Sequence, residues 1–430
     1  MQRLHAWLAQ WGPVLPLLVA EAVIWTGFGA MLPVMPLYFT QHGVDLPTLG
    51  VVVAAWPAAR LIGEPIFGWV ADRAPRTTLM VIGLVAGSAF AVLPLFITGP
   101  VAFIVLRAGS GLASSMYDPA ARAYLVDANP PARQGEAFGL YGSAQTGGLM
   151  LGPAIGGVVA AILGSPDVVF WVAGVAMLIS AVLIALRVPE LPHAHADDPD
   201  VAEPEEEVGS GTYVRPTRLL NLLVLAAICF NVAIYFSYGS YEVIWSLYMT
   251  SLGADLALIG LTFFSFALPP LLLSPFFGKF IDREGGFFAL VIGMAVIAGC
   301  GLLYPMIREI WWMVALGLVE GTAFAAAAPS IYLLVARSAP RGRSSTAQGL
   351  LGGAGTIGTI VASLAAGTLA ATSLAYPFYA VGVVGLIGLS AGVLLGRRRL
   401  YDAMQPKRPQ AVAPVLATAG APFDGSGDLR

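Results

Sequence analysis

The charged side chains inside the long apolar stretches of this chain include Glu21, Arg107, Glu242 and Glu320. A charge at the centre of a hydrocarbon layer costs about 2.5–3.5 kcal/mol on insertion scales, so such residues face a water-filled cavity, pair with one another or relay protons. We therefore interpret these four as proton-coupling residues. For each of them, a structural ion pair is the alternative interpretation.

Glu21 is the first candidate for the proton carrier. It lies roughly 12 Å from the start of its helix at 1.5 Å per residue, and no partner stands at helical spacing from it. Glu320 is the second candidate, because it is nearest to the middle of the membrane. By contrast, Arg60 and Glu64 are four residues apart, so they share one helix face and can neutralise each other. We interpret this pair as structural, with a coupling role as the alternative.

Aromatic side chains crowd the two stretches that hold Glu21 and Glu242. Rings in a dry cavity stack on apolar groups and attract cations by about 1 to 2 kcal/mol. The candidates for a substrate cavity are Trp25, Phe28, Tyr235, Phe236, Tyr238, Tyr241 and Trp245. The alternative for each is contact with lipid or with a neighbouring helix.

Enzymatic and metal chemistry find little support in the sequence. His5, His42, His193 and His195 all lie outside the apolar stretches, and the chain has no H-E-x-x-H or C-x-x-C motif. Cys229 and Cys300 lie inside apolar stretches without metal-ligand spacing, so we interpret both as packing residues. We expect neither an enzyme nor a bound metal or cofactor.

The composition predicts an all-α membrane protein. Hydrophobic residues make up 57% of the chain, charged residues only 11%, and the mean hydropathy is +0.79. A helix of about 20 apolar residues crosses a hydrocarbon core of roughly 30 Å. Twelve stretches qualify, at residues 13–38, 48–69, 78–98, 100–123, 137–163, 167–187, 218–249, 256–277, 287–306, 310–335, 346–370 and 374–396. The expected partner is the lipid bilayer, and no nucleic acid.

The sequence repeats itself at an offset of 210 residues. Leu37 to Gly50 matches Leu247 to Gly260 at seven of fourteen positions, and Asp72-Arg73 recurs as Asp282-Arg283. An offset that persists along the chain predicts two homologous halves. We expect six-helix bundles at residues 1–187 and 218–399, an acidic linker at 188–217 and a disordered tail at 400–430.

Basic residues predict the orientation, because cytoplasmic loops carry an excess of Lys and Arg. If the amino terminus is inside, the Lys and Arg residues beside the spans lie inside, except Arg308. We therefore expect a plasma or inner membrane protein with both termini in the cytoplasm. We expect it to work as a monomer.

Two matching loops on that side predict a cytoplasmic latch. Its residues are Gly68, Asp72, Arg73 and Arg76 in the first half, and Gly278, Asp282 and Arg283 in the second. Glycine allows close helix approach, and the charges can pair with a neighbouring helix end and release it when the halves move. The alternative is a charge cluster that only sets orientation.

Prolines and glycines mark two places where helices bend or pack closely. Pro33 and Pro36 predict a bend in the first span, and a lipid-facing kink is the alternative. The fifth span contains Gly148, Gly152, Pro153, Gly156 and Gly157, which form a thin, bendable surface. A plain packing seam is the alternative there.

These motifs together resemble the major facilitator superfamily, and within it the twelve-span drug:proton antiporters. The signature loop of that family is similar to Gly68 through Arg76, its arginine motif to Arg107 through Gly111, and its antiporter motif to Gly148 through Gly157. Its exporter proline motif is similar to Pro33 and Pro36. Pro75 and Thr77 depart from the family pattern in the latch loop.

The resemblance implies a cavity between two six-helix bundles, lined by the first, fourth, seventh and tenth spans. It implies a proton-coupled exporter of lipophilic or cationic small molecules that works by alternating access. A carrier for a polar metabolite is the alternative within transport, although few Asn and Gln residues fall in the cavity spans. A receptor or scaffold that transports nothing is a further alternative.

Overall fold

The computed structural model describes residues 11–12, 14–191, 218–340 and 343–405. The regular elements of this part of the chain are all helical. The first half contains α2 (Leu15–Met31), α3 (Met35–Gln41), α4 (Leu46–Ala71), α5 (Arg76–Val92), α6 (Pro100–Asp127), α7 (Pro131–Leu163) and α8 (Val168–Arg187). The second half contains α9 (Leu222–Ser251), α10 (Leu256–Glu284), α11 (Phe287–Leu303), α12 (Ile310–Ser338), α13 (Ser344–Ala370) and α14 (Tyr376–Ala403). Short 3-10 turns, η1 (Leu93–Leu95) and η2 (Tyr304–Met306), extend α5 and α11.

The helices follow the predicted order of spans. Within the described residues, ten single helices are long and apolar enough to cross a membrane, and the bent pair α2 and α3 makes eleven. The 28 residues of α6 are long enough to cross, but Arg107, Asp118 and Arg122 make this helix less apolar than the others. It occupies the place of the predicted fourth span. The all-helical architecture is therefore confirmed, with α6 as the span whose composition is atypical.

The two halves repeat local contacts as well as sequence. Asp45 caps α4 by accepting a hydrogen bond from the Thr48 backbone N–H at 3.1 Å. Asp255 caps α10 in the same way, by accepting a hydrogen bond from the Leu258 backbone N–H at 2.8 Å. The Tyr38 hydroxyl likewise donates to the carbonyl of Pro94 at 3.0 Å. Tyr248 donates to the carbonyl of Tyr304 at 3.4 Å in the second half. Each of these pairs is related by the 210-residue offset.

The predicted bend in the first span is present. The helix stops at Met31 and resumes at Met35, and the axes of α2 and α3 differ by 42°. Pro33 lies in the break and Pro36 in the first turn of α3, where a missing amide donor costs least. The corresponding helix of the second half, α9, runs for 30 residues without a break. The bend is thus a feature of the first half alone.

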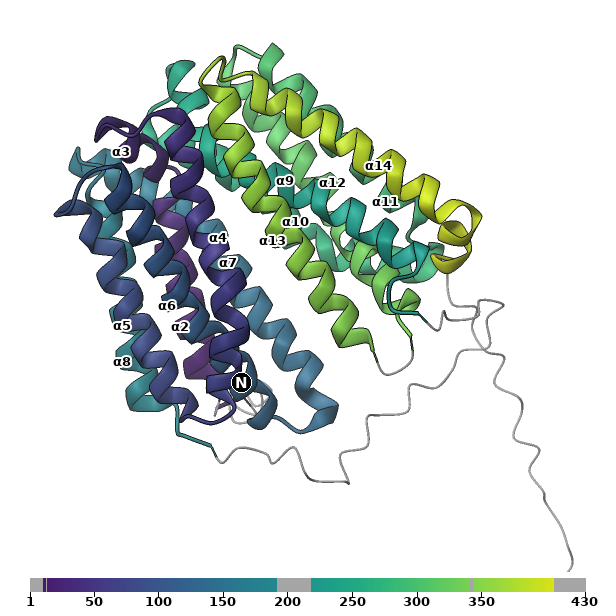
Figure 1. Cartoon of the computed structure of the whole chain (residues 1–430), viewed down its shortest axis with the longest axis horizontal. Helices are drawn as coiled ribbons and strands as arrows, with labels where there is room; N and C mark the ends of the chain where they lie inside the picture. Colours follow the sequence, from purple (N-terminus) through teal and green to yellow (C-terminus); the bar gives the residue numbers. More distant parts are fainter. Residues whose placement is uncertain (1–10, 13, 192–217, 341–342, 406–430) are drawn as a thin grey trace, which may run out of the picture.

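The halves meet through glycines on α4 and α13, and on α7 and α10. A Cβ atom at Gly50 would lie 2.4 Å from the Ser363 carbonyl oxygen, and one at Gly157 would lie 2.5 Å from that of Leu256. Both contacts lie near the end of the molecule that holds α3. The ribbons of the two halves converge at that end and diverge toward the end marked N (Figure 1). The helices of the two halves therefore lie farther apart at the end where α2 begins.

The last helix extends beyond its predicted end. The expected tail begins at residue 400, whereas α14 continues to Ala403 and buries Leu400 and Met404. The acidic run at residues 197–207 and the tail from residue 406 lie outside the described residues, as do His5, His193 and His195.

Candidate functional site

Glu21 lies fully buried on α2, with 0% of its surface exposed. Its carboxylate accepts hydrogen bonds from the Trp25 indole at 2.8 Å, the Tyr117 hydroxyl at 2.8 Å and the Gln145 amide at 3.2 Å. The expectation of no partner at helical spacing is therefore wrong, because Trp25 stands one turn further on. All three donors are neutral, and among the described residues no cation forms an ion pair with this group.

A second polar cluster lies between α4 and α6. Arg60 Nη2 is 2.5 Å from both Glu64 Oε1 and Asp118 Oδ2, and its guanidinium lies 4.7 Å above the centre of the Trp56 ring. The Arg60–Glu64 pair predicted from spacing is present. Asp118 was missed by the sequence analysis, although it stands eleven residues after Arg107, about three helical turns along the same helix.

Arg107 and Glu242 form an ion pair that joins the two halves. The distance from Arg107 Nη2 on α6 to Glu242 Oε1 on α9 is 2.9 Å. Hydropathy could not predict this ion pair, because the two residues are 135 positions apart in the sequence. Among the described residues no acceptor lies within hydrogen-bonding distance of Arg107 Nε, although this atom is buried. One donor of the guanidinium is therefore left over.

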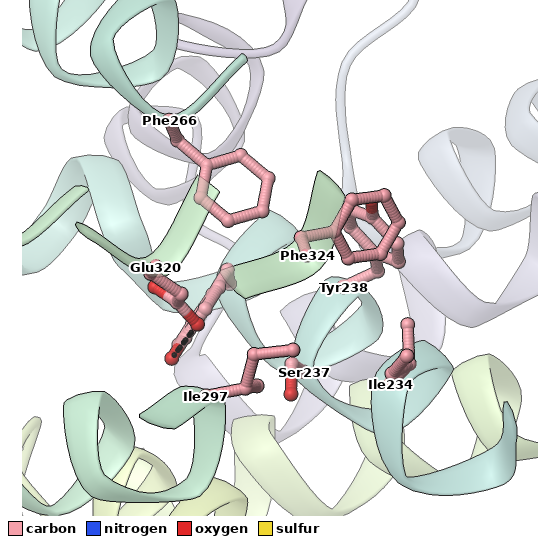
Figure 2. A pocket seen from close by; sticks show the side chains of 8 residues that line it. Ile234, Ser237, Tyr238, Phe266, Ile297, Glu320 and Phe324 are labelled. Carbon is pink, nitrogen blue, oxygen red and sulfur yellow. Dashed lines mark hydrogen bonds between the residues drawn. The ribbon is translucent and has the colours of Figure 1, made fainter. Parts of the chain in front are cut away.

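Glu320 on α12 lies in the second half, only 1% exposed. Its two carboxylate oxygens accept hydrogen bonds from the Tyr241 hydroxyl at 3.2 Å and the Tyr304 hydroxyl at 2.7 Å. Figure 2 shows the carboxylate among the side chains that line a small cavity. The other lining residues are Ile234, Ser237, Tyr238, Tyr241, Phe266, Ile297 and Phe324. Tyr304 was missed by the sequence analysis, because it lies in the ninth predicted span, which was not expected to line the cavity.

The predicted cavity aromatics separate into groups. Tyr238 and Tyr241 line the Glu320 cavity, and Phe28 lines a cavity in the first half. Trp25 is occupied as a donor to Glu21, and Trp245 donates to the Thr262 hydroxyl at 2.8 Å. Phe236 is buried and Tyr235 half-buried, and neither lines these cavities. For these four the packing interpretation fits better.

The latch residues are engaged within the first half. The Arg76 guanidinium pairs with Asp127 and donates to the Ala123 carbonyl at 2.9 Å, both at the end of α6. Its backbone N–H donates to Glu190 at 2.7 Å. Arg73 lies over the Trp69 ring at 4.1 Å. Pairing with a neighbouring helix end is therefore present, but these contacts do not connect the two halves.

The remaining latch residues form fewer contacts. In the part of the chain that the structure describes, Asp72, Asp282 and Arg283 take part in no ion pair within 4 Å. A Cβ atom at Gly68 would approach Pro119 only to 4.0 Å, and one at Gly278 would contact nothing within that distance. Close helix approach at these two glycines is thus absent in this arrangement.

The glycines of the fifth span pack against α2. A Cβ atom at Gly148 would lie 2.4 Å from the Ala22 carbonyl oxygen, one at Gly152 would lie 2.6 Å from the Gly29 Cα atom, and one at Gly156 would lie 2.3 Å from the Ala30 carbonyl oxygen. Pro153 lies inside the continuous helix α7. The packing alternative is therefore realised in this arrangement.

Two pseudo-symmetric helical halves, with charged side chains buried at membrane depth, define the architecture of a secondary transporter. The model of the Major Facilitator Superfamily matches residues 17–243 and 229–424. The chain belongs to this superfamily. It is a multi-pass membrane protein, as the apolar helices also require.

Similar proteins are transporters. The chain is 23% identical over 377 residues to the Staphyloferrin B transporter of Staphylococcus aureus, covering 85% of this chain and 88% of that protein. It is 25% identical over 228 residues to the quinolone resistance protein NorA of Staphylococcus aureus, covering 52% of this chain and 58% of NorA.

Solved structures share the fold. A bacterial homologue of the human lysosomal transporter Spinster, in an inward-facing and occupied conformation, superposes with a TM-score of 0.73. It is 14% identical and covers 91% of this chain and 98% of its own. The nucleoside transporter NupG gives 0.70 at 14% identity, covering 89% of this chain and 98% of its own.

Proposed function

We propose that the protein exports lipophilic, cationic small molecules in exchange for protons. The observation that carries the proposal is a pair of buried carboxylates, Glu21 and Glu320, one in each half, whose hydrogen-bond donors among the described residues are all neutral. A buried carboxylate without a cationic partner is costly, so a proton or a bound cation must neutralise it. Competition between the two is the basis of antiport.

The surroundings of the two carboxylates assign them different roles. Glu320 lines a cavity with Tyr238, Phe266 and Phe324, whose rings offer flat apolar surface and cation–π attraction. We assign it to the substrate cation. Glu21 lines neither described cavity and is enclosed by three donors. We assign it to the proton.

The transport cycle follows from these assignments. Substrate binds the deprotonated site from the face that carries the amino terminus, which we propose is cytoplasmic. After the halves rock to open the other face, protonation neutralises the carboxylates and releases the substrate. One proton that crosses about 150 mV supplies about 3.5 kcal/mol, enough for a gradient on the order of 300-fold of a neutral solute. The cycle needs no cofactor, and one chain contains every group it uses.

Two features support this assignment over a carrier of polar metabolites. The lining of the Glu320 cavity is mainly aromatic and aliphatic, whereas a sugar needs many hydrogen-bonding side chains. One similar protein is the quinolone resistance protein NorA. The alternative remains as one outcome of the experiment.

The experiment follows a pH-sensitive dye in everted vesicles that hold a proton gradient. Addition of ethidium or tetraphenylphosphonium should dissipate the gradient in the wild type. Glu21→Gln and Glu320→Gln should each abolish this response, because a neutral amide at position 21 cannot carry the proton and one at position 320 cannot attract the substrate cation. The matched control is Glu309→Gln, which changes the N-cap of α12 away from both clusters. Undiminished exchange in both variants would reject the roles of these carboxylates. A response to polar metabolites alone would establish the alternative.

A further inference from the structure

Three consecutive arginines lie near the end of the last helix, α14. Arg397, Arg398 and Arg399 are all exposed, and in the part of the chain that the structure describes none of them forms an ion pair. Asp402 is the one acidic residue among residues 397–405. Three guanidinium groups thus stand together on the surface with little compensating charge, and such groups bind anions well.

The backbone at these arginines departs from a regular helix. Arg397 has φ 47° and ψ −136°, and among the described residues it is the only one other than glycine with a positive φ. Residues with a Cβ atom rarely adopt this conformation, and strained backbone of this kind is concentrated at functional sites. The chain turns here, at the yellow end of α14 (Figure 1). The turn sets residues 398–403 off from the straight part of the helix.

Hydrogen bonds from two other helices hold this terminal segment in place. The carbonyl of Met404 accepts a hydrogen bond from the Gly286 backbone N–H at 3.0 Å, directly before α11. The Arg337 guanidinium of α12 donates to the carbonyls of Ala403 at 3.1 Å and Gln405 at 2.7 Å. The three exposed arginines therefore belong to a fixed framework, which lowers the entropy cost of binding a ligand.

The two halves close this corner of the molecule in different ways. The 210-residue offset maps Gly286 onto Arg76. In the first half the backbone N–H of Arg76 donates at 2.7 Å to the Glu190 carboxylate instead of a carbonyl. One arginine, Arg187, ends α8 there, at the position that corresponds to Arg397. Closing the corner therefore does not by itself require three arginines.

An apolar surface on α14 leads up to the arginines. Val383, Leu386, Ile387 and Leu394 are between 43% and 66% exposed. Val383 and Leu394 are eleven positions apart in the sequence, about 16 Å along a helix, which is about half of a hydrocarbon core of roughly 30 Å. The arginines begin within one helical turn of Leu394. An acyl chain that lies along this surface would therefore place its headgroup beside them.

Aromatic rings lie next to the arginines as well. Tyr401 contacts Phe287 and Phe288 of α11, with ring centres 5.4 and 6.5 Å away. Tyr401 and Phe288 are both exposed. Tyrosine is enriched where a membrane protein passes from hydrocarbon to headgroups. This places the arginines at the level at which lipid phosphates lie.

We propose that Arg397, Arg398 and Arg399 bind the phosphate of an anionic phospholipid, whose acyl chains lie along the apolar surface of α14. Guanidinium groups match phosphate oxygens in pairs, and arginines at an anionic membrane surface attract its lipids. A soluble phosphate offers the arginines the same chemistry but leaves the apolar surface uncovered. The site is independent of the transported molecule and of proton exchange.

The test counts lipid molecules bound to the purified full-length protein by native mass spectrometry. We expect the wild type to bind its first phosphatidylglycerol at least about fivefold more tightly than the neutral phosphatidylcholine. Replacing the three arginines together, as Arg397→Gln, Arg398→Gln and Arg399→Gln, should weaken the first phosphatidylglycerol at least about tenfold. Equal binding of the two lipids by the wild type would reject the site.

The matched control removes the same charge from the first half. Its changes are Arg73→Gln, Arg133→Gln and Arg187→Gln, at three exposed arginines near the ends of α4, α7 and α8. It should change the affinity for phosphatidylglycerol by less than about twofold, because attraction by net charge alone does not distinguish the two variants. Equal loss in both variants would reject the site, since it would show that only the total charge matters.

Two further arms keep the outcome decisive. Replacing the three arginines by lysine keeps the charges that orient the helix in the membrane, so this variant decides if thermal unfolding shows that the glutamine variant is not folded. It should weaken phosphatidylglycerol at least about threefold, because lysine lacks the paired donors of arginine, and wild-type affinity would contradict the proposal. The second arm adds glycerophosphoglycerol, the headgroup without acyl chains, in large excess. It should leave lipid binding unchanged, whereas full displacement would assign the arginines to a soluble phosphate and reject the lipid.

Discussion

At the scale of single residues, the buried carboxylates divide by what neutralises them. Glu64 and Asp118 share Arg60, and Glu242 has Arg107. In the part of the chain that the structure describes, the donors to Glu21 and Glu320 are phenol, indole and amide groups. We propose that the first group is structural and that the second exchanges protons and cations.

The ion pair between the halves gives a prediction about stability. Arg107→Glu or Glu242→Arg alone should lower stability strongly, because breaking a buried pair costs about 3–5 kcal/mol. The double variant Arg107→Glu with Glu242→Arg should recover part of that loss. Thermal unfolding of the four proteins in one detergent measures the coupling. Additive losses in the double variant would show that the two side chains do not act as a pair.

At the scale of the helices, glycine sets how closely the halves approach. Gly50 and Gly157 correspond to Gly260 and Gly367 by the 210-residue offset. A Cβ atom at Gly367 would lie 2.5 Å from the Leu46 carbonyl oxygen, and one at Gly260 would lie 2.4 Å from that of Pro153. The repeat therefore supplies two equivalent seams, α4 with α13 and α10 with α7. Both lie at the closed end of the molecule.

The seam between α7 and α10 allows a prediction about how a larger side chain at Gly157 changes the populations of the two conformations. Gly157→Leu should push α7 and α10 apart and populate an arrangement that opens at the α3 end. Spin labels on Gln41→Cys and Ser251→Cys, in a Cys229→Ala and Cys300→Ala background, report the distance between the halves there. Both label sites are exposed, at the ends of α3 and α9. We expect longer distances between the two labels in the Gly157→Leu variant than in the labelled protein that keeps Gly157.

The matched control lies on the same helix. A Cβ atom at Gly147 would contact nothing within 4 Å, so Gly147→Leu should leave the distance distribution unchanged. An unchanged distribution in Gly157→Leu as well would show that this seam does not set the closed end.

At the scale of the whole molecule, the architecture could be predicted from the sequence, whereas the pairing of charges on different helices could not. Length and apolarity of each stretch give the helices, and one constant offset gives the two halves. The bend at Pro33 follows from local chemistry alone. These features depend on residues close together in the chain.

The site depends on contacts between helices that are far apart in the chain, and the spacing of residues in the sequence does not predict such contacts. Arg107 and Glu242 meet across 135 residues, and Tyr304 reaches Glu320 from a turn. Helix rotation decides which ring lines a cavity, and hydropathy does not fix rotation. Tyr238 and Trp245, one group in the prediction, therefore differ in the structure: the first lines the Glu320 cavity and the second packs in an aromatic cluster.

The central claim is that a substrate cation and protons compete for the buried carboxylates. The most direct measurement is proton release into weakly buffered solution when tetraphenylphosphonium binds the purified protein. The wild type should release protons, and its affinity should fall as the pH falls, by at most about tenfold per pH unit for each competing proton. Glu320→Gln should remove most of the release. Tetraphenylphosphonium binding by the wild type that releases no protons and is independent of pH would contradict the account.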